Sequence, residues 1–290
     1  MLVCSGVFVG LVYTIAVLTP QGQAIENAAL RGADQVSNRD FDEASAALDQ
    51  ITIWSLAVAT LAVGLIGLLR RRPKLGVIAV GVIFVGQMLT QSLKRFILPR
   101  PELVAVSGDF TGNSFPSGHT TIAMTVLIAM FLVVPYRARA LTVGIVSLWA
   151  VGIGAYTLTA KWHRLSDTLG ADLIALALGA AATIVLLRFG MLRRVKRRMW
   201  GQVGIIIFWV LTGFVALTLG AILLSAAVRY PLTDPLIEWD VYLGAHAIAI
   251  AGSLFVAIVF WVSWLRIDTV PSGFAQSRSF ERVDARASRM

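Results

Sequence analysis

The chain has 290 residues, of which 57% are hydrophobic and 14% are charged, and its formal net charge is +9. Soluble globular proteins carry about 25% charged residues, so this composition excludes an ordinary soluble domain, a disordered chain and a collagen-like chain, and it predicts an integral membrane protein. The single cysteine, Cys4, excludes an internal disulfide and a cysteine metal site. Only three histidines are present, which argues against a polyhistidine metal centre.

Eight apolar stretches are long enough to cross a bilayer, which requires about 20 largely apolar residues. They are residues 2–19, 51–69, 75–93, 117–135, 141–160, 167–188, 203–228 and 242–264. The first stretch lacks the preceding Lys or Arg of a signal peptide, so we interpret it as a true span. We therefore expect an all-α polytopic membrane protein with about eight transmembrane helices.

Lys and Arg residues are distributed unevenly between the two sides that these spans define. Residues 70–74, 136–140, 188–202 and 265–290 hold 4, 2, 6 and 5 of them, whereas the opposite side holds 8. Cytoplasmic loops are enriched in Lys and Arg, so we expect both termini in the cytoplasm and a location in the plasma (inner) membrane. Contact with anionic membrane lipids explains the basic runs beside the spans, and we expect no nucleic-acid partner.

The chain divides into four segments along its length. We expect a six-span membrane core at 1–188, a basic cytoplasmic linker at 189–200, two additional spans within 201–265, and a disordered polar tail at 266–290. Residues 20–50 are expected to form an acidic outer loop, with at most a short surface helix. No chemistry is assigned to that loop.

Three polar patches interrupt the apolar sequence, and all three fall on the expected outer side. The first runs from Lys94 to Pro101, the second from Phe115 to His119, and the third from Lys161 to Asp167. A single patch of this kind is explained by long side chains that reach the membrane surface. Three patches at neighbouring helix ends on one face indicate a functional site instead.

The residue types in the first two patches suit an anion. Lys94 and Arg100 are cations, and the planar guanidinium group fits phosphate oxygens. Ser117 can cap the helix that follows it, and Gly118 leaves the N–H groups of the helix start open to an anion. His119, in the first turn, is placed to donate a proton.

The third patch contains a histidine and a carboxylate with a specific spacing. His163 and Asp167 are four residues apart, which places them on one face of a helix. Asp167 can accept a hydrogen bond from one ring nitrogen and leave the other nitrogen free to attack. A capping pair at an ordinary helix start is the alternative, and no further residues are spaced as metal ligands.

The ordered set Lys…Arg-Pro, Pro-Ser-Gly-His and His-x3-Asp resembles the type 2 phosphatidic acid phosphatase family, which is related to the vanadium haloperoxidases. The resemblance covers residues 75–188, and spans one to six in outline. It implies a helical core and hydrolysis of lipid phosphates without a metal or cofactor. It also implies that His163 is the nucleophile that forms a phosphohistidine, that Asp167 orients it, and that His119 is the general acid. The residues it assigns to phosphate binding are Lys94, Arg100, Ser117 and Gly118.

Two positions depart from the family pattern. The usual first motif has six residues between Lys and Arg, whereas five separate Lys94 from Arg100, and the loss of one residue rotates a helical side chain by about 100°. The usual third motif begins with Ser-Arg, but Thr157 occupies the arginine position. We expect Lys161 or Arg164 to supply the missing positive charge to the phosphate.

These expectations together describe a membrane lipid phosphatase. The phosphate of phosphatidate, phosphatidylglycerophosphate or a polyprenyl diphosphate fits such a site, with the lipid tail in the outer leaflet. Two alternatives remain open. One is a phosphotransferase, in which a second alcohol replaces water, and the other is an inactive lipid-binding or transport relative. The sequence indicates neither the oligomeric state nor the role of the last two spans.

Two further ionisable residues lie within apolar stretches. We expect His246, near the outer end of the last span, to make a structural hydrogen bond between helices. Asp172 lies five residues after Asp167 and is rotated away from its face. It is expected to pair either with a basic residue of the site or with another span.

Overall fold

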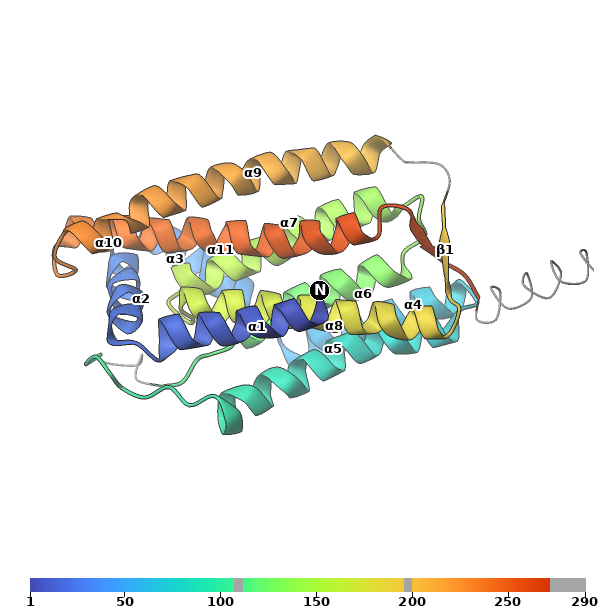
Figure 1. Cartoon of the computed structure of the whole chain (residues 1–290), viewed down its shortest axis with the longest axis horizontal. Helices are drawn as coiled ribbons and strands as arrows, with labels where there is room; N and C mark the ends of the chain where they lie inside the picture. Colours follow the sequence, from blue (N-terminus) through green and yellow to red (C-terminus); the bar gives the residue numbers. More distant parts are fainter. Residues whose placement is uncertain (107–111, 196–199, 272–290) are drawn as a thin grey trace, which may run out of the picture.

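The structure is a computed structural model that describes residues 1–106, 112–195 and 200–271. Its long helices run side by side along the longest axis of the molecule, and shorter elements close the two ends (Figure 1). The long helices are α1 (Leu2–Val12) together with η1 (Tyr13–Val17), which continues it, α4 (Ile53–Leu69), α5 (Pro73–Ser92), α6 (Gly118–Val133), α7 (Arg139–Thr159), α8 (Leu165–Arg188), α9 (Trp200–Leu224) and α11 (Pro235–Ser263). The shorter elements are α2 (Pro20–Gly32), η2 (Ala33–Gln35), α3 (Asn38–Asp49), η3 (Leu93–Ile97), β1 (Leu192–Arg194), α10 (Ala226–Arg229) and β2 (Ile267–Thr269).

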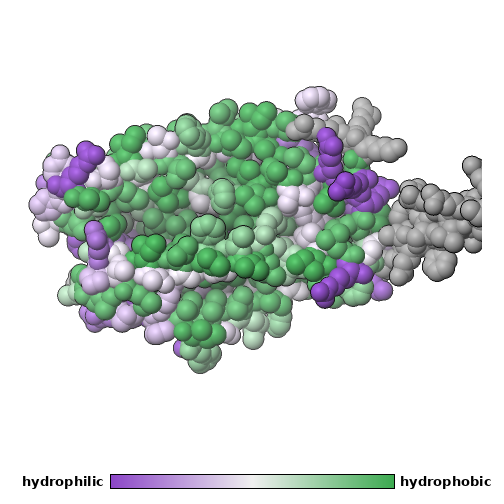
Figure 2. Space-filling model, in the orientation of Figure 1, coloured by the Kyte–Doolittle hydropathy of each residue, from purple (hydrophilic) through white to green (hydrophobic). Residues whose placement is uncertain are grey.

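Each of the expected apolar stretches overlaps one of the long helices. Among the described residues, five helices are long and apolar enough to cross a membrane, or up to seven if each of two bent pairs is one span. The bent pairs are α1 with α2 and α3 with α4, and α6 is a shorter apolar helix. Figure 2 shows a broad hydrophobic surface between two hydrophilic ends. The expected all-α membrane fold is confirmed.

The core of the molecule lies around α6, which packs against α5, α7 and α8. This helix is apolar on nearly every side, a pattern that is stable only where neighbouring helices surround it. Small residues bring the other helices close. A Cβ atom at Gly179 of α8 would lie 2.8 Å from the ring of Phe260 of α11, so glycine permits this approach. One of the additional spans, α11, is therefore packed directly on the core, and α9 packs mainly on α11.

Residues 20–50 differ most from the expectation, because they form two helices instead of a loop. The hydroxyl of Thr19 accepts a hydrogen bond from the N–H of Gly22 at 3.0 Å and caps α2. The hydroxyl of Ser37 accepts one from the N–H of Asp40 at 3.2 Å and caps α3. Such caps satisfy helix-start N–H groups that otherwise lack a partner. In Figure 1, α2 lies across one end of the bundle, roughly perpendicular to the long helices.

The opposite end is closed by a two-stranded antiparallel ribbon of β1 and β2. The guanidinium of Arg72 donates to the hydroxyl of Thr269 at 2.7 Å and holds the ribbon against the bundle. The linker expected at 189–200 therefore contains a strand. The tail expected at 266–290 begins with the second strand, and from residue 272 onwards it lies outside the described residues.

Candidate active site

The three polar patches come together at the end of the bundle that α2 crosses. A cavity of about 680 Å³ is present there, and its lining includes Lys94, Asn113, Lys161, His163 and Arg164. These residues come from η3, which follows α5, from the segment before α6, and from the turn between α7 and α8. Residues that are far apart in the sequence therefore share one cavity.

The carboxylate of Asp167 engages the ring of His163. The Oδ2 atom of Asp167 lies 3.3 Å from His163 Nδ1 and also accepts a hydrogen bond from the backbone N–H of Arg164 at 2.8 Å. Since α8 begins only at Leu165, His163 precedes the helix, and the two residues meet across a helix start rather than on the expected common face. Asp167 is completely buried, whereas His163 lines the cavity, so Nε2 is the nitrogen left for a ligand.

His119 lies close to this pair, in the first turn of α6. The ring centroids of His119 and His163 are 6.2 Å apart, so both can reach one phosphoryl group. Ser117 caps α6 as expected, because its hydroxyl accepts a hydrogen bond from the N–H of Thr120 at 3.2 Å. The backbone N–H of Ser117 donates to the carbonyl of Asp167 at 2.9 Å. This bond ties the second patch to the third.

Gly118 stands at the first helical position of α6. A Cβ atom added there would lie 3.6 Å from the side-chain nitrogen of Gln91, which is an ordinary contact. Packing within the protein therefore does not require glycine at this position. The proposed reason, close approach of an anion to the helix start, stays a prediction.

Lys94 lines the cavity despite its shortened distance from Arg100 in the sequence. It lies in η3, a π-helical turn in which the N–H of Leu98 bonds to the carbonyl of Leu93 at 2.8 Å. The i→i+5 bond of a π turn is wider than the α-helical bond and changes the direction in which its side chains point. The amide of Asn113 donates to the carbonyls of Lys94 and Leu98 at 2.8 Å and 2.6 Å and holds this turn.

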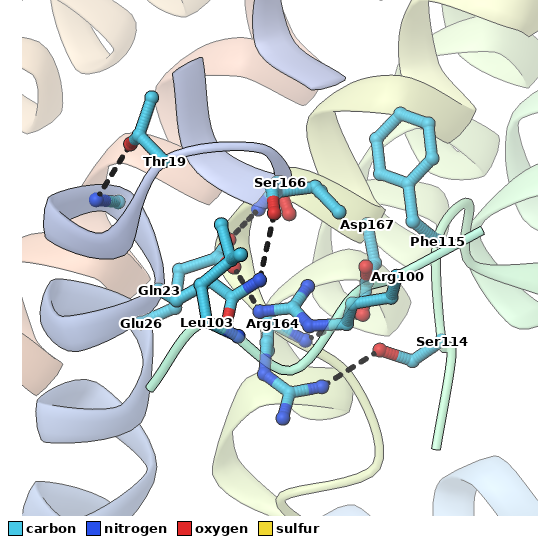
Figure 3. A network of polar contacts seen from close by, with 12 residues as sticks. Thr19, Gln23, Glu26, Arg100, Leu103, Ser114, Phe115, Arg164, Ser166 and Asp167 are labelled. Atoms are coloured by element: carbon cyan, nitrogen blue, oxygen red, sulfur yellow. Dashed lines mark hydrogen bonds and ion pairs between the residues drawn. The ribbon is translucent and has the colours of Figure 1, made fainter. Parts of the chain in front are cut away.

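Arg100 and Arg164 are both buried, in different surroundings. Arg100 Nη2 pairs with Glu26 Oε2 at 2.9 Å, and both side chains are only 6% exposed. Arg164 lines the cavity, and its Nη1 donates to the hydroxyl of Ser114 at 3.1 Å (Figure 3). Burial, and next the neighbouring Arg100 cation, lower the pKa of the Arg164 guanidinium. Two buried cations close together favour an anion beside them.

Thr157, which occupies the expected arginine position, faces the core. Its hydroxyl bonds to the carbonyl of Gly154 at 2.7 Å and lies 3.2 Å from the hydroxyl of Thr168. Both proposed replacements, Lys161 and Arg164, line the cavity. Lys161 also forms an ion pair with Asp34, so its charge is shared with a carboxylate.

No three His, Cys, Asp or Glu side chains within the described ranges are grouped closely enough to hold a metal ion. The charged groups at the cavity are instead mainly cationic, with Lys94, Lys161 and Arg164 in its lining. Such a lining suits an anionic ligand. With His163 in the lining, and His119 and the buried carboxylate of Asp167 next to His163, the site can support nucleophilic attack and proton transfer.

A comparison with known protein families agrees with this arrangement of site residues. Residues 75–191 match the family model of the PAP2 superfamily. This segment, called the PAP2 domain below, is similar to that superfamily. All the site residues expected from the sequence, from Lys94 to Asp167, fall within that domain.

Known proteins resemble this chain over different shares of its length. Phosphatidylglycerophosphatase B of Escherichia coli K12, of Escherichia coli O157:H7 and of Shigella flexneri is in each case 43% identical over 74 residues. This match spans 25% of the chain and 29% of the length of each relative. A solved transmembrane PAP2 type phosphatidylglycerolphosphate phosphatase from Bacillus subtilis shares the fold, with a TM-score of 0.54 and 19% identity. That likeness covers 64% of this chain and 96% of the other.

The sequence alone did not predict several residues that surround the candidate active site. Asn113 and Ser114 directly precede the second patch. Their polar amide and hydroxyl groups at this position could have indicated that they belong to the site. Glu26, which bonds to Arg100, lies outside the PAP2 domain in the segment expected to be a loop. Nothing in its local sequence distinguishes it from the other acidic residues of that segment.

The two remaining ionisable residues lie apart from the cavity lining. Asp172 Oδ2 accepts a hydrogen bond from the hydroxyl of Ser253 at 2.8 Å, so the partner of Asp172 is another span, α11. His246 lies beside Tyr242 of the same helix, with ring centroids 5.9 Å apart. The interhelical hydrogen bond expected for His246 is not found in the part of the chain that the structure describes.

Proposed function

We propose that the chain is a membrane lipid phosphatase that hydrolyses a phosphomonoester or diphosphate of a lipid through a phosphohistidine on His163. The observation that carries this proposal is the contact between His163 Nδ1 and the buried carboxylate of Asp167, with His119 close by. Lys94 and Arg164 place positive charge at the same cavity. This set of groups supplies a nucleophile, a proton donor and an anion site.

The reaction proceeds in two steps. In the first, Nε2 of neutral His163 forms a bond to phosphorus while the bond from phosphorus to the leaving oxygen breaks, and protonated His119 gives its proton to that oxygen. Asp167 stabilises the positive charge that develops on the His163 ring. In the second step, neutral His119 takes a proton from water, the water oxygen bonds to phosphorus, and the bond to Nε2 breaks. Inorganic phosphate and free His163 result.

The cations stabilise the charge on the phosphoryl oxygens in both steps. Phosphoryl transfer depends mainly on positioning and on such electrostatic stabilisation. Lys94 and Arg164 line the cavity, and Arg100 lies next to Arg164. No step of this scheme requires a metal ion, so we expect activity in the presence of a chelator.

The substrate is a lipid whose phosphate reaches the hydrophilic end while its chains stay beside the hydrophobic surface (Figure 2). The names of the relatives favour phosphatidylglycerophosphate, and phosphatidate and polyprenyl diphosphate are the other candidates. We place the site on the extracytoplasmic face. The opposite end holds the ribbon with Arg72, Arg193 and Arg194, and basic residues gather on the cytoplasmic side.

The test is phosphate release by the purified chain in detergent with EDTA, on a panel of these three lipids. We expect release from at least one lipid, and a loss of about 10³-fold or more in His163→Ala. His246→Ala is the matched control, because this third histidine lies beside Tyr242 in α11 rather than with the pair of His119 and His163, and we expect it to retain activity.

Three results contradict parts of the proposal. Equal release by His163→Ala excludes His163 as the nucleophile, and loss of release with EDTA excludes a metal-independent reaction. Transfer of the phosphoryl group to an added alcohol, without release to water, identifies a phosphotransferase instead.

A further inference from the structure

A carboxylate from outside the PAP2 domain is built into the phosphate site. Glu26 of α2 is buried, and its two oxygens have different partners (Figure 3). Oε2 pairs with Arg100 Nη2 at 2.9 Å, and Oε1 accepts a hydrogen bond from the backbone N–H of Ser166 at 2.9 Å. Ser166 directly precedes Asp167 in the first turn of α8. One side chain therefore connects the first polar patch to the third.

The neighbouring Gln23 holds the segment that follows Arg100. Its amide nitrogen donates to the carbonyl of Pro101 at 2.7 Å, and its amide oxygen accepts from the backbone N–H of Leu103 at 3.1 Å. Gln23 and Glu26 lie three residues apart, so they occupy the same face of α2. This face of α2 fixes both the backbone and the guanidinium of the Arg100 region.

The other end of α2 is attached to α11, one of the two additional spans. Arg31 forms an ion pair with Glu238 and donates to the carbonyl of Leu232 at 2.9 Å. The amide of Gln35 donates to the carbonyl of Pro235 at 2.8 Å. The backbones are also very close, because a Cβ atom at Gly32 would lie 2.1 Å from the carbonyl oxygen of Glu238.

We propose that α2, held by the N-terminal end of α11, supplies Glu26 as a positioning residue that fixes Arg100 and the first turn of α8 for phosphate binding. This inference rests on the proposed function and extends it to α11, one of the two additional spans. The contribution of α11 is to keep α2 across the end of the PAP2 domain, at the site.

The charges explain why a carboxylate is useful at a site for an anion. Arg100 Nη1 is buried and has no hydrogen-bond partner among the described residues, while Nη2 is bound to Glu26. A guanidinium held through one nitrogen keeps its remaining N–H groups in a fixed direction. Glu26 also offsets part of the repulsion between Arg100 and Arg164, which lowers the cost of burying both.

The alternative role for Glu26 is that of a simple opposing charge, and it predicts the opposite effect. A negative charge beside the site weakens anion binding, so its removal alone strengthens the binding of phosphate. A positioning role predicts weaker binding in Glu26→Gln, because Arg100 loses its fixed direction. The sign of the change separates the two roles.

The experiment compares Glu26→Gln with the wild-type chain in detergent with EDTA, using inorganic phosphate as the probe. We expect the inhibition constant of inorganic phosphate to rise about 10- to 100-fold and kcat to fall by a similar factor. Glu43→Gln is the matched control. Glu43 pairs with Arg39 on the exposed surface of α3, and we expect no change in either constant.

A second variant tests the attachment to α11 and does not depend on the folding of Glu26→Gln. Glu238→Gln weakens the ion pair with Arg31, and we expect the same inhibition constant to rise about two- to fivefold. An unchanged or lower inhibition constant in Glu26→Gln overturns the positioning role. An unchanged constant in Glu238→Gln overturns the role assigned to α11.

A further readout separates this inference from the proposed function. The rise in unfolding temperature on addition of inorganic phosphate requires no turnover. Wild-type protein that phosphate stabilises, but that hydrolyses no lipid phosphate, contradicts the proposed function alone. If this stabilisation is equally large in Glu26→Gln, the positioning role is contradicted whether or not the chain is an enzyme.

Discussion

Replacement of Asp167 by asparagine tests the mechanism with little change in shape. In Asp167→Asn the carbonyl oxygen takes the place of Oδ2, because only an oxygen can accept both from the backbone N–H of Arg164, at 2.8 Å, and from Nδ1–H of His163, at 3.3 Å. The ring keeps its tautomer, with Nε2 free to attack, but the negative charge beside the ring is lost. The positive charge that develops on the His163 ring in the first step is therefore stabilised less.

The size of the effect follows from these contacts. The equivalent change in a Ser-His-Asp triad lowers kcat by about 10⁴-fold because it imposes the wrong tautomer. The tautomer is kept here and only the charge is lost, across a distance of 3.3 Å from Oδ2 to Nδ1, so we expect a smaller fall in kcat, of about 10- to 100-fold. We expect little change in KM, because Asp167 is outside the cavity lining. The altered hydrogen bonds change the free energy of unfolding by about 1–2 kcal/mol.

The assay measures initial rates of phosphate release for Asp167→Asn, with Asp172→Asn as a matched control. Asp172 is a second buried aspartate of α8, and its carboxylate bonds to Ser253 away from the cavity lining. We expect Asp172→Asn to stay within about threefold of the wild-type rate. A rate for Asp167→Asn within threefold of wild type refutes the role given to the charge of Asp167, and an equal loss in both variants shows that the effect is one of folding.

The remaining predictions concern the cations and proton transfer. In Arg164→Met, we expect the inhibition constant of inorganic phosphate to rise about tenfold or more. In Lys161→Met we expect a rise of less than threefold, because the ammonium group of Lys161 is shared with Asp34. The reverse order identifies Lys161 as the replacement for the missing arginine. The pH profile of kcat/KM is bell-shaped because one histidine must be neutral and the other protonated; a single ionisation contradicts the paired roles. Asn113→Ala lowers kcat/KM about tenfold by releasing the turn that carries Lys94, and an unchanged kcat/KM contradicts the function assigned to that turn.

The helices of this protein were predictable because a bilayer demands long apolar runs. The stretch expected at 167–188 corresponds to α8, and that expected at 141–160 corresponds to α7, each within two residues at both ends. Residues 20–50 were not predictable in the same way. Their composition is that of an exposed helix or a loop, and only the capping hydroxyls of Thr19 and Ser37 indicate where two helices begin.

The candidate site was predictable where its residues follow one another closely in the sequence. His163 and Asp167 are such a pair, although the spacing alone indicated a shared helix face rather than a contact across a helix start. The contact between Glu26 and Ser166 joins residues 140 positions apart, and no local sequence pattern indicates it. The direction of Lys94 depends on a π turn, which spacing rules for an α-helix do not anticipate.

The most direct test of the account is detection of a phosphoryl group on His163. The purified chain carrying His119→Ala is mixed with p-nitrophenyl phosphate, whose leaving group requires no proton, and the reaction is stopped in alkali. We expect the peptide that contains His163 to carry a phosphoryl group in mass spectrometry, because the second step lacks its general base. A phosphoryl group on another residue, or undiminished turnover of lipid phosphates by His163→Ala, contradicts the account.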